Sequence, residues 1–119
     1  MKKILLISSM FLLILSCTNV SEDDLIDAEP LPDLVTYQAN VKVIIDNNCL
    51  NCHGIPQTNG ASIPLVYYAN VKTAVMNNNL IGRISGTGPG SLMPLGGPKL
   101  PQNLIDLIIQ WEADGFIEE

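Results

Sequence analysis

The chain has 119 residues, with twelve acidic against six basic side chains and a formal net charge of −6 at pH 7. A chain of this length forms one small domain. The acidic balance argues against a nucleic-acid-binding protein, because such proteins neutralise phosphates with Lys and Arg. It favours partner proteins that offer a basic docking patch.

Residues 1–16 have the pattern of an export signal. Two lysines follow Met1, and residues 4–16 are apolar apart from three serines. This run is too short to span a bilayer as a helix and is typical of a signal peptide. Its end, Leu15-Ser16-Cys17, resembles the lipobox of bacterial lipoproteins, in which the signal is cut before the cysteine and the cysteine carries lipid. We therefore expect lipid on Cys17, with an ordinary secretory signal and an unrelated cysteine as the alternative.

Residues 17–35 are expected to be an acidic linker between the lipid and the domain. Residues 22–24 are all acidic, and the prolines at positions 30 and 32 cannot continue a helix. Without residues 1–16, four basic side chains remain against all twelve acids, a formal charge of −8. The predicted location is the cell envelope, with the protein anchored to a bacterial membrane and facing the periplasm or the cell surface.

Residues 36–119 are expected to be the folded domain, and its first helix is predicted over residues 36–48. Thr36 can cap this helix. Val41, Ile44 and Ile45 recur at helical spacing. The helix therefore delivers Cys49 at its C-terminal end.

Two more helices follow. One is predicted over residues 67–76 and ends at a run of three asparagines. Residues 82–99 are rich in Gly and Pro and are predicted to be a long, functional loop. The last helix begins near Pro101, ends at Gly115 and carries its apolar side chains at Leu104, Ile105, Ile108, Ile109 and Trp111. No segment has a strand pattern, so the predicted fold class is all-α.

The run Cys49-Leu50-Asn51-Cys52-His53 carries the chemistry. It has the Cys-x-x-Cys-His spacing of a c-type haem attachment site. Two thiols three positions apart can add to the two vinyl groups on one edge of the porphyrin. The histidine that follows, the only one in the chain, is then placed to give the iron a nitrogen ligand.

Other uses of the cysteine pair remain open. A zinc site needs four ligands and usually a second pair, which the chain lacks. A thioredoxin-like redox pair would follow a strand, whereas the segment before Cys49 is predicted to be helical. A disulfide between Cys49 and Cys52 would close a small, strained loop.

The second axial ligand of a haem iron would be a methionine, because no second histidine exists. The candidates outside the signal peptide are Met76 and Met93. Met76 falls on the second predicted helix, where a methionine most often packs in the core. Met93 lies in the Gly- and Pro-rich loop, which can approach a flat cofactor closely. We favour Met93, and a five-coordinate iron is the alternative.

The order of helix, Cys-x-x-Cys-His, helix, Met-Pro loop and closing helix resembles the small class I cytochromes c, over roughly residues 36–117. Within them, the chain is similar to short monohaem domains of bacterial lipoproteins. The resemblance implies a cytochrome c-like fold of three to four helices around one covalent haem c. It also implies that the first and last helices cross beside the haem. The matching residues are Tyr37, Val41, Met93, Pro94, Leu100, Ile105, Ile108 and Trp111.

Supporting roles are predicted for a few further residues. His53 should donate its free ring N–H to a backbone carbonyl, and Pro64 matches the proline that the family places there; a simple turn proline is the alternative. Arg83, the only arginine, can pair with a haem propionate or be an exposed charge. Trp111 packs near the haem or fills the core, and only one of Tyr67 and Tyr68 can face inward.

The expected function is that of a monohaem cytochrome c that carries single electrons between redox partner proteins and is not an enzyme. Two alternatives remain: a haem c subunit of a larger oxidoreductase, and a haem-based ligand sensor or peroxidase-like protein with an open iron position.

Overall fold

A computed structural model of the chain describes residues 30–119. The predicted signal peptide, Cys17 and most of the predicted linker lie outside the described residues. Residues 30–119 form helices and no strand, so the all-α class is confirmed for this part of the chain. None of its helices is long and apolar enough to cross a membrane. The elements are η1 (Tyr37–Val41), α3 (Lys42–Asn48), α4 (Leu50–His53), α5 (Tyr68–Asn77), α6 (Leu80–Ser85) and α7 (Gln102–Ala113).

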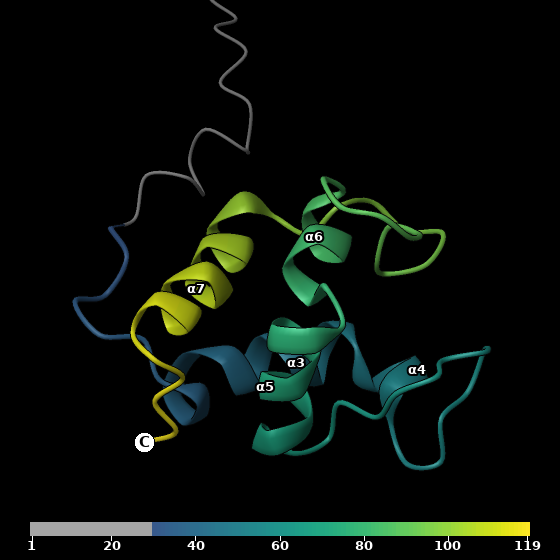
Figure 1. Cartoon of the computed structure of the whole chain (residues 1–119), viewed down its shortest axis with the longest axis horizontal. Coiled ribbons are helices and arrows are strands. Elements are labelled where there is room, and N and C mark those ends of the chain that lie inside the picture. Colours follow the sequence, from purple (N-terminus) through teal and green to yellow (C-terminus); the bar gives the residue numbers. More distant parts are fainter. Residues whose placement is uncertain (1–29) are drawn as a thin grey trace, which may run out of the picture.

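The first predicted helix is confirmed as the π-helical turn η1 running directly into α3 (Figure 1). Thr36 caps it as expected, because its hydroxyl accepts a hydrogen bond from the backbone N–H of Ala39 at 3.3 Å. The apolar side chains at Val41, Ile44 and Ile45 are all buried. The helical periodicity of the sequence therefore marks the face that packs into the core.

The predicted helices over residues 67–76 and from Pro101 onward are confirmed as α5 and α7. Pro101 precedes the first residue of α7, and Gly115 follows its last turn at a φ of 85°. The loop prediction over residues 82–99 is wrong at its start, because residues 80–85 form α6. The sequence does not indicate this helix, because it is short and contains Gly82, a residue that disfavours helices.

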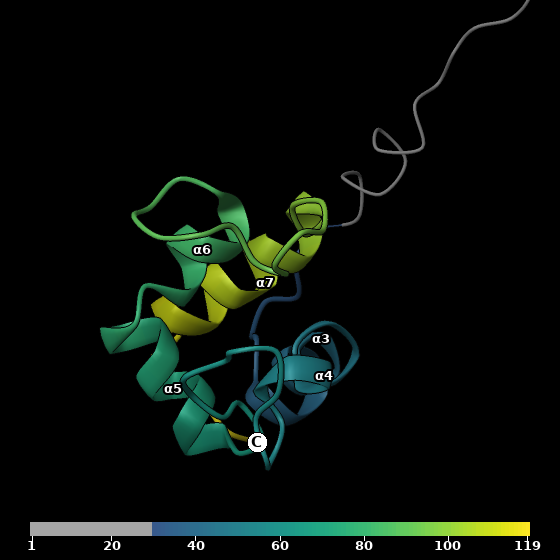
Figure 2. The ribbon, with the colours of Figure 1, turned by 90° about the vertical axis from the view of Figure 1, so that its right-hand side faces the viewer.

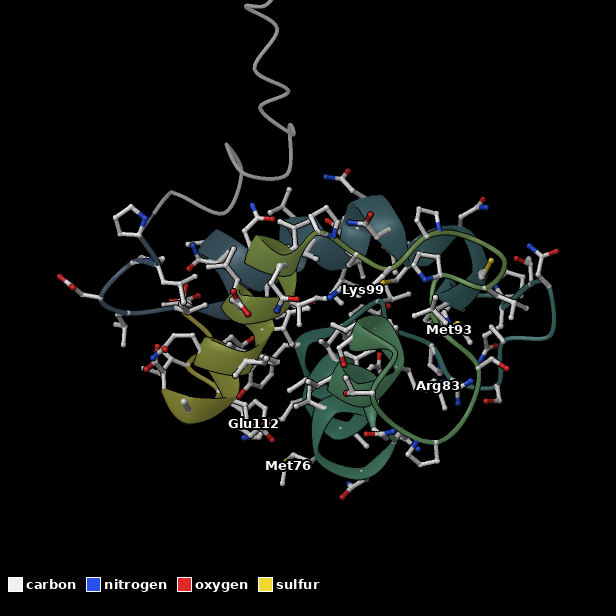
Figure 3. The ribbon with its side chains drawn as sticks, turned by 90° about the horizontal axis from the view of Figure 1, so that it is seen from above. Met76, Arg83, Met93, Lys99 and Glu112 are labelled. Carbon is white, nitrogen blue, oxygen red and sulfur yellow. The ribbon has the colours of Figure 1, made fainter. Side chains whose placement is uncertain are left out.

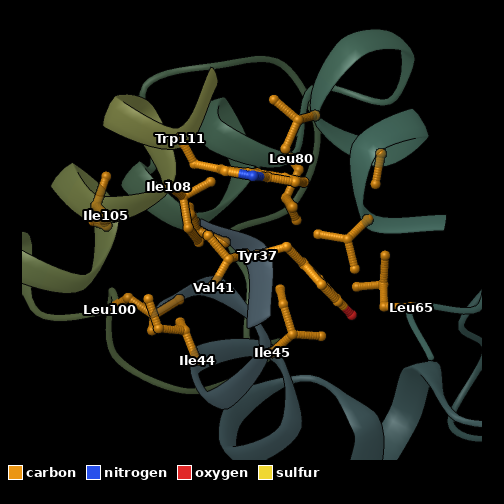
Figure 4. Packing of buried hydrophobic residues seen from close by; sticks show 14 of the residues in the cluster. Tyr37, Val41, Ile44, Ile45, Leu65, Leu80, Leu100, Ile105, Ile108 and Trp111 are labelled. Atoms are coloured by element: carbon orange, nitrogen blue, oxygen red, sulfur yellow. The ribbon is translucent and has the colours of Figure 1, made fainter. Parts of the chain in front are cut away.

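The core lies where α7 packs against η1 and α6 (Figure 4). Trp111 is fully buried at its centre, and its ring lies 4.9 Å from that of Phe116 and 5.8 Å from that of Tyr37, measured between centroids. Its indole N–H donates to the carbonyl oxygen of Ile117 at 2.8 Å. Trp111 therefore joins the last helix to the first one and to the C-terminal residues.

Trp111→Ala should destabilise the protein by about 3–5 kcal/mol, because the substitution leaves a large cavity between η1 and α7. Chemical denaturation of the purified protein measures this loss. Ile109→Ala on the same helix is the matched control. The side chain of Ile109 is 42% exposed, so its truncation should cost much less. Equal losses from the two variants would contradict the central position of Trp111.

Helix α4 and the loop after α6 lie at the same end of the molecule, and Figure 2 views this end directly. Helix α4 carries Cys52 and His53, and the loop carries Met93. The fold thus brings the two candidate segments to one end of the helical core.

Candidate functional site

The two cysteines lie at the junction between α3 and α4. Cys49 ends α3 and begins α4, with its N–H donating to the carbonyl oxygen of Ile45 at 2.9 Å. The N–H of His53 donates in turn to the carbonyl oxygen of Cys49 at 2.8 Å. Residues three apart on one helical turn share a face. Both cysteines are free and half-buried, and their spacing puts them on the same side of this helical turn.

The ring of His53 is oriented by a backbone carbonyl. Its Nδ1 lies 2.7 Å from the carbonyl oxygen of Ile63. A carbonyl oxygen can only accept, so Nδ1 carries the proton, and the lone pair that can bind a metal is on Nε2. The acceptor is the carbonyl of the Ile63–Pro64 peptide bond, one residue before the predicted proline. Pro64 therefore takes part through its peptide bond with Ile63 and not through its own carbonyl.

The loop after His53 is attached to α4 by further hydrogen bonds. The N–H of Leu65 donates to the carbonyl oxygen of His53 at 2.8 Å, and the N–H of Thr58 donates to that of Cys52 at 2.9 Å. The side-chain amide of Asn59 donates to Sγ of Cys52 at 3.3 Å. Nothing in the sequence singles out Asn59, because its role depends on the path of the loop.

Burial raises the pKa of the Cys49 thiol to about 11, and the neighbouring Cys52 adds to this shift. The thiol of Cys49 is therefore protonated at neutral pH. The attacking cysteine of a thioredoxin-like pair has the opposite property, a lowered pKa that makes it a thiolate. This difference counts against the redox-pair interpretation.

The two candidate methionines lie in different surroundings, well apart in Figure 3. Met93 is half-buried and packs against the core, and its N–H donates to the carbonyl oxygen of Arg83 at 3.0 Å. Met76 is 57% exposed, so the expectation that it packs in the core is wrong. The buried face of α5 is formed by Val71, Ala74 and Val75, and Met76 follows on the outer face.

Arg83, Trp111 and the two tyrosines lie in different surroundings. Arg83 donates from Nε to the carbonyl oxygen of Ser91 at 3.2 Å, within the loop that carries Met93. Trp111 belongs to the core. Tyr68 is the tyrosine that faces inward, and its hydroxyl donates to the carbonyl oxygen of Phe116 at 2.7 Å. Tyr67 is 63% exposed.

Two large apolar side chains near the candidate ligands are exposed. Ile55, two residues after His53, is 63% exposed, and Leu95, two residues after Met93, is 66% exposed. Exposed isolated apolar residues are common on protein surfaces. Their positions on the two candidate segments nevertheless suit an apolar group that both segments would cover.

A groove with a volume of about 360 Å³ opens between η1 and the start of α5. Its lining includes Lys42, Tyr67, Tyr68 and Glu118. Its lining also includes Tyr37, but none of the residues expected to attach the haem or bind its iron. Residues 30–119 hold no cluster of three or more His, Cys, Asp or Glu side chains placed to bind a metal ion.

Comparison with known proteins found no matching family model, no matching curated protein and no matching solved structure. The assignment of function therefore rests on the chemistry of α4, its loop and the segment around Met93.

Proposed function

We propose that the protein is a lipid-anchored, monohaem cytochrome c that carries single electrons between redox partners. Haem c is attached through Cys49 and Cys52, and the iron is ligated by His53 and Met93. The observation that carries the proposal is the hydrogen bond of His53: its Nδ1–H is bound to a carbonyl, which leaves the lone pair of Nε2 for a metal, directly after a pair of free thiols.

The residues of the chain fit such a group. Each thiol can add across a vinyl double bond, so that a carbon–sulfur bond forms, the thiol hydrogen passes to the other vinyl carbon and nothing leaves. The carbonyl of Ile63 fixes the ring of His53 and strengthens Nε2 as a ligand. Haem c, when bound, supplies a one-electron couple between ferric and ferrous iron.

The helical arrangement supports a cytochrome c-like fold. The resemblance places Tyr37, Val41, Ile105 and Ile108 where the first and last helices cross. All four side chains are buried, two on η1 and two on α7, and these two elements pack against each other. The exposed Ile55 and Leu95 gain cover if a haem lies between their segments. A domain of this size buries little apolar surface by itself, so a bound haem would add to its stability.

The optical spectrum of the loaded protein tests the function. An electron carrier should show a ferric thioether-to-iron band, cycle between ferric and ferrous states, and bind carbon monoxide only weakly in the ferrous state. Both axial positions are then filled by the protein. A ferrous spectrum that shifts fully under carbon monoxide would instead support the sensor or peroxidase-like alternative.

Lipid on Cys17 is proposed to anchor the protein to a bacterial membrane. Cys17→Ser should abolish incorporation of labelled fatty acid, because serine offers no thiol for the lipid, while the wild-type chain should be labelled. Labelling in growing cells measures the modification directly. Membrane fractionation would be less clear, because an uncleaved signal peptide could keep the Cys17→Ser variant on the membrane without lipid. Equal labelling of the two proteins would contradict the lipoprotein assignment.

A further inference from the structure

Arg83 makes two hydrogen bonds to the loop that carries Met93. Its carbonyl oxygen accepts the N–H of Met93 at 3.0 Å. Its Nε donates to the carbonyl oxygen of Ser91 at 3.2 Å. The two bonds flank Leu92, so the backbone next to the candidate ligand is attached to one residue of α6. Figure 3 shows Arg83 and Met93 together at this end of the molecule.

Asn79 also makes a hydrogen bond to this loop, at a residue that precedes Ser91. Its side-chain amide donates to the carbonyl oxygen of Pro89 at 3.4 Å. The amide lies so close to Gly82 and Gly88 that a Cβ atom on them would come within 2.4 and 2.3 Å of it. These glycines therefore make room for the Asn79 side chain between α6 and the loop.

Gly90 likewise leaves room for the side chain of Arg83 beside the loop. A Cβ atom there would lie 3.1 Å from a guanidinium nitrogen of Arg83, and the φ of Gly90 is 97°. Close contact and backbone conformation both favour glycine at this position. We term Asn79 and Arg83 the loop bracket. Both contact the loop at places where glycines leave room for their side chains.

We propose that the loop bracket positions Met93, so that the thioether stays on the iron. This inference rests on the proposed haem ligation. It assigns Arg83 a role through hydrogen bonds to the loop, in place of an ion pair with a haem propionate. A long, glycine-rich loop has many conformations when free. Each bond to α6 removes some of them and raises the fraction of molecules in which Met93 is in place.

Four variants test the bracket in the haem-loaded protein. Asn79→Gly removes the side chain and keeps the left-handed backbone, whose φ is 55°. Arg83→Gln removes the charge and the guanidinium, whereas Arg83→Lys keeps the charge but lacks the planar fork. Lys99→Gln removes an exposed charge whose ammonium contacts Gln102, and it is the control.

Asn79→Gly, Arg83→Gln and Arg83→Lys should each weaken the ferric thioether band and raise the apparent affinity of the ferrous protein for carbon monoxide about tenfold, equivalent to about 1.4 kcal/mol. Lys99→Gln should match the wild type. If Arg83→Lys behaves as wild type while Arg83→Gln does not, the charge of Arg83 matters and the inference is wrong. An unchanged Asn79→Gly also overturns it.

Hydrogen exchange at the N–H of Met93 gives a second readout that does not require haem. This exchange should be about tenfold faster in Asn79→Gly and Arg83→Gln than in wild type, because the loop opens more often. Should the wild-type protein carry no haem, the proposed function fails, yet this measurement still tests the bracket. Faster exchange together with an unchanged thioether band would show that the bracket does not control ligation.

Discussion

Haem should stay on the chain after complete denaturation when the protein is produced with a haem-maturation system. The double variant Cys49→Ala/Cys52→Ala should lose all of it on the same treatment. The reason is chemical: a thioether survives unfolding, whereas coordination by His53 does not. Haem absorbance of the denatured chain, separated from free haem, measures the retained fraction. The expected change is from nearly complete retention to none.

Asn51→Ala is the matched control for this experiment. Asn51 lies between the two cysteines and is exposed, and its contact to the loop runs through its backbone carbonyl. Its variant should keep haem as the wild type does. Each single cysteine variant should keep haem through the other thioether. If haem washes out of the denatured wild-type chain, the central proposal is wrong.

The helices could be predicted from the sequence wherever an apolar stripe and an end signal occur together. Thr36 and the periodic apolar residues indicate the first helix, and Pro101 and Gly115 indicate where the last helix begins and ends. Helix α6 has no clear signal in the sequence, because six residues offer less than two turns of periodicity and because Gly82 indicates a loop. Its glycine serves close packing against Asn79, which only the folded chain reveals.

The site could be predicted as far as local spacing determines it. Five consecutive residues indicate the thiol pair and His53. The carbonyl that orients the ring belongs to Ile63, the residue before the predicted Pro64. The partners of Arg83, Asn59 and Asn79 depend on where two loops run, and no local pattern encodes that. The error at Met76 has a similar origin, since the register of α5 decides which of its side chains face the core.

Met93→Ala should abolish the thioether-to-iron band, lower the reduction potential and let carbon monoxide bind to the ferrous protein. A thioether ligand favours ferrous iron and would fill the sixth position in the proposed ligation, and alanine can do neither. Absorbance of the ferric protein, a redox titration and carbon monoxide binding measure the three effects. Met76→Ala is the matched control. Met76 is 57% exposed on α5, so this change should leave the spectrum intact and alter the free energy of unfolding by no more than about 0.5 kcal/mol.

The outcomes separate three assignments of the sixth ligand. Loss of the band in Met93→Ala alone supports Met93, whose half-buried side chain lies in a loop attached to α6. Loss of the band in Met76→Ala alone would reverse the assignment and would require the exposed end of α5 to move. If the wild type has no thioether band and binds carbon monoxide, the iron is open, and a sensor or peroxidase-like function replaces electron transfer as the better proposal. The same set of spectra therefore decides both the ligand and the class of function.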